Sequence, residues 1–221
     1  IGRPFLDGRT MVQAGVGDAK FVVYNVSAKD APAGEALINW IADIRIAPAL
    51  DQGRSAPARE DWSKPGRIAD LTPTFGDWRF DWLDVPAIMR GAQAIYEWPM
   101  VDRDPLPYWH VGRVALLGDA AHPMYPIGSN GATQAILDAE ALADALDAEA
   151  PIDALARYDD ARRPMASDIV RLNRAQGLDA VLDHIDRLAP NGFADIADVV
   201  DPAEIAAMIN GYKRAAGHRA P

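Results

Sequence analysis

The stretch from Gly112 to Leu146 constrains this chain more than any other part of its sequence. It opens with an apolar run, Val114 to Leu117, which a glycine precedes and a Gly-Asp pair follows. An apolar run between turn residues is typical of a strand covered on both faces, as in a parallel sheet. A carboxylate directly after such a strand lies where open α/β sheets bind ligands. The stretch therefore predicts that Gly118 and Asp119 lie at the edge of a ligand site.

Two interpretations of Asp119 are open on spacing alone. Its carboxylate could accept hydrogen bonds from the hydroxyls of a ribose or ribityl chain, or it could cap a nearby loop. The adjacent Gly118 has no side chain, so another backbone or a ligand can approach closely. The spacing does not choose between these two roles for the carboxylate.

A proline-bounded loop then leads into a helix. Small and apolar residues recur at helical spacing from Ala132 to Leu146, which predicts a helix that lies close to a sheet or to a flat ligand. Backbone N–H groups near 130–133 would lack helical partners there, and the positive end of the helix dipole favours negative charge. A phosphate or an anionic ring system would fit at this point.

The first hundred residues predict an antiparallel sheet. Strand-like runs cover 10–14, 21–27 and 36–45, with turn-rich segments between them, and the last two runs are rich in Val, Ile, Tyr and Trp. In the third run, Asn39 shares its face with apolar neighbours, and either a sheet-locking hydrogen bond or a ligand contact would satisfy its amide. Further along, the pattern predicts helices at 68–75 and 78–89, a strand at 93–101, and helices at 153–172, 179–188 and 201–212.

Composition excludes several classes of function. The formal charge of −10, from 32 acidic and 22 basic residues, repels nucleic acid. The chain has no cysteine, which removes disulfides and thiolate metal sites, and its four histidines lack the spacing of metal ligands. No apolar run reaches the roughly 20 residues of a membrane span. We expect a cytoplasmic monomer or homodimer that binds no nucleic acid, membrane or metal.

The Gly112–Pro123 sequence resembles the second flavin motif of the p-hydroxybenzoate hydroxylase-like, FAD-dependent aromatic monooxygenases. The lead-in at 102–107 with Trp109 and the helical segment 134–139 are also similar to that family. Around 124–133 the sequence departs from the family's common pattern and is more similar to its phenazine and salicylate hydroxylase-type branch. The resemblance implies an α+β and α/β fold: a substrate-binding antiparallel sheet region (1–109), a second FAD-binding segment (110–150) and a C-terminal helical region (151–221).

The resemblance also assigns roles to residues of this chain. It places Asp119 on the FAD ribityl chain and the 126–132 segment along the isoalloxazine ring. The expected cofactor-binding residues are Gly118, Asp119, Pro126, Gly128, Ser129, Asn130, Gly131 and Ala132, and the expected substrate-pocket residues are Met124, Tyr125, Tyr24 and Asn39.

In such an enzyme NAD(P)H reduces FAD, and the reduced flavin uses oxygen to hydroxylate a small aromatic substrate. Because the flavin performs the chemistry, no side chain is assigned as catalytic, and we expect His122 to bond to the backbone of its loop. Related folds include epoxidases and reductases, which keep the flavin and change the reaction. A non-catalytic fragment or binding module is the third interpretation.

The family's opening strand, G-x-G-x-x-G turn and helix have no counterpart in this sequence. Those elements hold the ADP half of FAD. The chain therefore resembles the C-terminal part of such an enzyme, and we expect it to bind FAD weakly or not at all and to be inactive alone.

Overall fold

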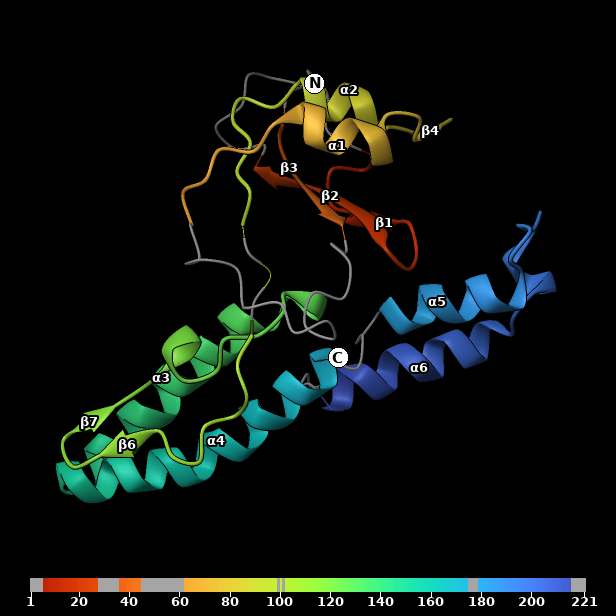
Figure 1. Cartoon of the computed structure of the whole chain (residues 1–221). Helices are drawn as coiled ribbons and strands as arrows, with labels where there is room; N and C mark the ends of the chain where they lie inside the picture. Colours follow the sequence, from red (N-terminus) through yellow and green to blue (C-terminus); the bar gives the residue numbers. More distant parts are fainter. Residues whose placement is uncertain are drawn as a thin grey trace, which may run out of the picture. The chain divides into compact units, whose positions relative to one another are not determined.

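The computed structural model describes residues 6–27, 36–44, 62–98, 100, 102–174 and 179–215. The chain divides into two compact units, Ile1–Pro99 and Met100–Pro221, each with its own core (Figure 1). Small antiparallel sheets and several helices make up the fold, which confirms the predicted mixed class. The functional division at residues 109 and 150 stays a prediction.

A three-stranded antiparallel sheet, in the order β1-β2-β3, forms the base of the first unit. Its strands are β1 (Val12–Ala14), β2 (Ala19–Ser27) and β3 (Leu37–Ile44). The alternation of side chains along β2 buries Phe21 and Val23 completely. On the opposite face, the register places Tyr24 directly across from Asn39. The three strands agree with the sequence pattern, although Leu37 and Ile41, which share the face of Asn39, are exposed.

Two short helices cover the buried face of this sheet (Figure 1). Helix α1 (Ile68–Phe75) contributes Phe75 to the core, and helix α2 (Val85–Arg90) contributes Val85 and Met89. Asp84 caps α2, because its carboxylate accepts a hydrogen bond from the Ala87 N–H at 2.8 Å. This cap ensures that α2 starts at Val85.

Two of the elements expected between residues 78 and 101 are absent from the described residues. The predicted helix at 78–89 is wrong in its first half, which forms a hairpin of β4 (Arg79–Phe80) and β5 (Leu83–Asp84). In place of the predicted strand at 93–101, the described residues form one isolated bridge, between Pro65 and Tyr96. Both corrections reflect local apolar patterns that tertiary packing overrides.

The second unit is mainly helical. A hairpin of β6 (His110–Val111) and β7 (Val114–Ala115) is followed by two 3-10 turns, Gly118–Ala120 and Ile127–Ser129. The hairpin lies beside a long helical pair (Figure 1). The helices are α3 (Gly131–Ala148), α4 (Pro151–Arg174), α5 (Asp179–Leu188) and α6 (Pro202–Ala215), with a further 3-10 turn, Ile196–Asp198, before α6.

The apolar run at 114–117 is not the strand that its sequence predicts. Gly112, with φ 58°, and Arg113 form a tight turn, so the chain folds back and pairs His110 with Ala115. Val114 is 68% exposed and Leu117 is 41% exposed. The expectation of a parallel strand buried on both faces is therefore wrong for the described structure, because a two-residue turn supplies a local antiparallel partner.

Candidate functional site

The Gly-Asp pair forms a tight turn at the end of the β6–β7 segment. Gly118 has φ 58°, and its carbonyl accepts hydrogen bonds from the N–H groups of Ala121 and His122, both at 2.9 Å. A Cβ at this position would lie 3.3 Å from the Cβ of Ala135 on α3. Glycine is therefore favoured twice, by the left-handed backbone and by the close approach of the helix.

Asp119 lies at the surface, directly after Gly118. The residue is exposed, and no group within the described residues bonds its carboxylate. A Cβ built on Gly131, the first residue of α3, would lie 4.0 Å from the Asp119 Oδ1 atom. The loop-capping alternative for Asp119 has no support in this geometry, and the carboxylate stands beside the start of a helix.

Helix α3 begins with groups that can bind a ligand. The first intrahelical N–H bond is made by Gln134, to the carbonyl of Asn130 at 2.9 Å. The N–H groups of 131–133 precede it and have no acceptor one turn earlier in the helix. Ala132 and Thr133 are exposed, so this end of the helix, with the positive pole of its dipole, faces outward beside Asp119.

The loop before α3 has an unusual backbone. Gly128 and Ser129 both adopt positive φ, 76° and 56°, which is uncommon for a residue with a side chain. Ser129 is exposed, whereas Asn130 is fully buried. Its side-chain amide donates to the hydroxyl of Tyr212 at 2.6 Å, so Asn130 faces the interior. Of the predicted ring-lining residues, Asn130 can therefore offer a ligand its backbone only.

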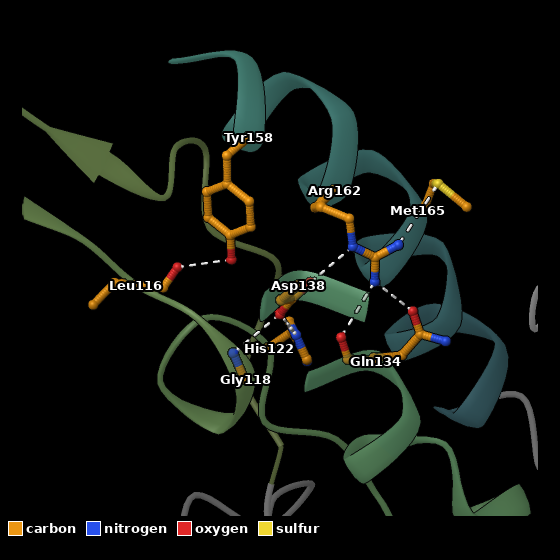
Figure 2. A network of polar contacts seen from close by, with 8 residues as sticks. All are labelled: Leu116, Gly118, His122, Gln134, Asp138, Tyr158, Arg162 and Met165. Carbon is orange, nitrogen blue, oxygen red and sulfur yellow. Dashed lines mark hydrogen bonds and ion pairs between the residues drawn. The ribbon is translucent and has the colours of Figure 1, made fainter. Parts of the chain in front are cut away.

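A buried polar network joins the Gly-Asp turn to helices α3 and α4. Figure 2 shows Asp138 of α3 between the Gly118 backbone, His122 and Arg162. The Asp138 carboxylate accepts from the Gly118 N–H at 3.0 Å, from His122 Nε2 at 2.6 Å and from Arg162 Nε at 2.8 Å. Arg162 also donates to Gln134 Oε1 at 2.7 Å. Asp138 thus ties helices α3 and α4 to the turn that presents Asp119.

The environment of Asp138 keeps its carboxylate ionised. Burial by itself raises the pKa of Asp138, but the hydrogen bonds from His122, Gly118 and Arg162 outweigh burial and lower the pKa below its usual value. His122 bonds to this carboxylate with one ring nitrogen, and its Nδ1 atom has no partner among the described residues. The expected bond from the His122 side chain to the loop backbone is therefore wrong.

A second buried carboxylate fixes the start of the hairpin. Asp159 of α4 accepts from the Trp109 N–H at 2.8 Å, His110 Nδ1 at 2.9 Å and Arg163 Nε at 2.6 Å. Tyr158 beside it donates to the carbonyl of Leu116 at 3.0 Å. Together with Asp138, these contacts anchor the segment before Gly118 to the helices. Both Arg162 and Arg163 therefore pair with acidic residues, Asp138 and Asp159.

The residues expected to contact substrate divide between the two units. Met124 and Tyr125 are half-buried in the loop after the Gly-Asp turn, and the Tyr125 carbonyl accepts from Asn173 Nδ2 at 3.0 Å. Tyr24 and Asn39 are cross-strand neighbours in the first unit, both half-buried. The structure brings each pair together within its own unit.

Neither a metal-binding cluster nor a membrane-spanning helix occurs among the described residues. Among the residues that the structure describes, no group of three His, Asp or Glu side chains could hold a metal ion. Over the same residues, no helix has both the length and the apolar character needed to cross a bilayer.

Sequence comparison identifies the class of domain that contains this site. Residues 84–173 match the family described as "FAD binding domain". The match includes the Gly-Asp turn, α3 and most of α4. It confirms the FAD-binding part of the resemblance that the motif at 112–123 predicted.

Individual relatives extend this similarity over most of the chain. A phenazine 1,6-dicarboxylic acid hydroxylase from Lysobacter antibioticus is 42% identical over 211 residues, which cover 95% of this chain and 48% of that protein. A 3-amino-4-hydroxybenzoate 2-monooxygenase from Streptomyces platensis is 41% identical over 121 residues, covering 53% of this chain and 30% of the relative. The chain spans about half or less of the length of these relatives.

Solved structures show the same fold. A salicylate hydroxylase in a substrate complex matches with a TM-score of 0.59 and 24% identity, covering 95% of this chain and 50% of that one. A 2,6-dihydroxypyridine-3-hydroxylase from Arthrobacter nicotinovorans matches with a TM-score of 0.57 and 16% identity, covering 76% of this chain and 44% of that one. At these identities the likeness concerns the fold alone.

Proposed function

We propose that residues 118–132 bind the ribityl chain and the isoalloxazine ring of FAD in a monooxygenase that hydroxylates a small aromatic substrate. The observation that carries this proposal is the exposed Asp119 carboxylate, which has no partner among the described residues and stands beside the start of α3. A ribityl chain offers hydroxyl donors to such a carboxylate, and a reduced flavin ring offers negative charge to helix N–H groups.

The residues present fit the cofactor in three places. Asp119 would accept hydrogen bonds from ribityl hydroxyls. The N–H groups of 131–133 would donate to the anionic part of the ring, and the half-buried Met124 and Tyr125 would contact the substrate. When bound and reduced by NAD(P)H, FAD would supply the chemistry that activates oxygen. The protein would orient the ring and exclude water. Tyr24 and Asn39 stay predicted substrate contacts.

The 221-residue chain by itself is proposed to bind FAD weakly and to be inactive. It matches about half the length of its hydroxylase relative, and its flavin contacts are those of 118–132. Its location in the cytoplasm and its state as a monomer or homodimer also stay predictions from the sequence.

Two flavins that differ in one part test the role of Asp119. Riboflavin and lumiflavin share the same ring. Riboflavin carries the ribityl chain, and in lumiflavin a methyl group replaces that chain. Asp119→Ala is expected to weaken riboflavin binding about tenfold, since a hydrogen bond to a charged group is lost, and to leave lumiflavin binding unchanged. The matched control is Asp144→Ala, an exposed aspartate on α3. Equal riboflavin affinity in the two variants, measured by flavin fluorescence titration, would refute the proposal.

A further inference from the structure

The C-terminal helix α6 reaches the loop that precedes α3 through one side chain. The Tyr212 hydroxyl accepts from Asn130 Nδ2 at 2.6 Å and lies 3.1 Å from the Ile127 carbonyl and 3.0 Å from Asn173 Oδ1. Tyr212 is 7% exposed, and Asn130 and Asn173 are almost completely buried. A phenol has one proton, so the hydroxyl donates to one of the two oxygen acceptors at a time.

Asn173 completes the connection from helix α4. Its Nδ2 group donates to the Tyr125 carbonyl at 3.0 Å, while its Oδ1 atom faces the Tyr212 hydroxyl. Helices α4 and α6 pack against each other (Figure 1). Asn173 therefore holds the start of the loop, at Tyr125. Tyr212 holds its middle, at Ile127, and its end, at Asn130.

Gly128 shows how closely Tyr212 fits the loop. A Cβ at residue 128 would lie 1.9 Å from the Tyr212 hydroxyl oxygen and 2.5 Å from its Cζ atom. The next residue, Ser129, is held at φ 56°. A residue with a side chain rarely adopts a positive φ unless its surroundings impose it. The contacts of Tyr212 with Asn130 and Ile127 are consistent with such a constraint on Ser129.

We infer that Tyr212 and Asn173 are positioning residues for the flavin ring. The inference rests on the proposed function. By fixing residues 125–130, the two side chains set the direction in which α3 begins and hence where the N–H groups of 131–133 point. Asp119 is fixed separately, through the Asp138 network. The site thus has two supports: the Asp138 network for the ribityl contact, and Tyr212 of α6 with Asn173 of α4 for the ring contact.

The two supports can be separated with Tyr212→Phe, which removes the hydroxyl and keeps the ring. Amide hydrogen exchange of residues 127–131 is expected to accelerate about tenfold, since the hydrogen bonds that hold the loop are lost. Lumiflavin and riboflavin affinities are expected to fall together by several fold. The matched control is Tyr158→Phe, which removes another buried hydroxyl of the same unit, the donor to Leu116. It is expected to leave exchange at 127–131 unchanged.

The outcomes distinguish the inference from the function on which it rests. Unchanged exchange at 127–131 in Tyr212→Phe, or faster exchange with unchanged lumiflavin affinity, overturns the inference. If Asp119→Ala still weakens riboflavin selectively in that case, the proposed function stands. If neither variant changes the affinity for either flavin, the proposed function fails and the inference fails with it.

Discussion

Replacing Arg162 with methionine tests whether the buried network holds the Gly-Asp turn. The guanidinium is almost completely buried and donates to Asp138 at 2.8 Å and to Gln134 at 2.7 Å. Removing one partner of a buried pair typically costs about 3–5 kcal/mol because an uncompensated charge remains. Asp138 keeps its bonds from His122 and Gly118, so we expect a loss near 3 kcal/mol in the free energy of unfolding of the second unit.

The loss is expected to depend on pH. The pKa of Asp138 is lowered in the folded state, so the stability it contributes is present above its unfolded pKa of about 3.9 and disappears as the pH falls through the folded value. Protonated Asp138 is neutral, so removal of the Arg162 guanidinium no longer leaves a buried carboxylate charge uncompensated. The difference between wild type and Arg162→Met should therefore shrink below about pH 4 and stay constant near pH 7.

Urea-dependent hydrogen exchange in α3 and α4 measures this effect in the second unit alone, which matters because a chain of two units need not unfold in one step. Arg171→Met is the control, because Arg171 pairs with Asp168 at the surface of the same helix and should contribute under about 1 kcal/mol. Equal losses in the two variants, or a loss for Arg162→Met that does not shrink as the pH falls below about 4, would contradict the role given to the network.

Two further substitutions test the local geometry. Gly118→Ala should destabilise the second unit by about 1–2 kcal/mol, because the left-handed backbone strains any Cβ and Ala135 lies close; an unfolding midpoint in urea equal to that of wild type would count against this. Tyr158→Phe should cost about 1 kcal/mol and speed amide exchange in residues 110–116, since Leu116 loses its donor; unchanged exchange there would show that the hydroxyl does not anchor the hairpin.

Local signals in the sequence predicted several elements well. Asp84 caps α2, and the Asp201 carboxylate accepts from the Ala203 N–H at the start of α6. The runs at 21–27 and 36–45 predicted the strands β2 and β3. Each of these features depends on residues within a few positions of one another, so spacing alone contains the information.

Burial was harder to predict from apolar character. The spacing on α3 suggested an apolar buried face, yet Ile136 is 70% exposed and the buried positions include Gln134 and Asp138. A carboxylate four residues after a glutamine, in a helix otherwise rich in alanine, was a signal that could have identified this face. Its meaning depends on Arg162, which is 24 residues away along the chain.

The support from α6 had no local signal at all. Tyr212 is 82 residues from Asn130, and nothing in the spacing of either residue indicates the other. Contacts of this separation arise from how helices pack, which the pattern along one helix does not specify. The same limit applies to Asp159, whose partner Trp109 is 50 residues away.

The most direct test of the flavin site is an amide NMR spectrum of the isotope-labelled 221-residue chain, recorded with increasing FAD. The account predicts that the largest shifts occur at Gly118, Asp119 and the 131–133 amides, even if binding is weak. Shifts centred on residues outside 118–133, or a spectrum unchanged by FAD, would contradict the assignment of this turn and helix start to the cofactor.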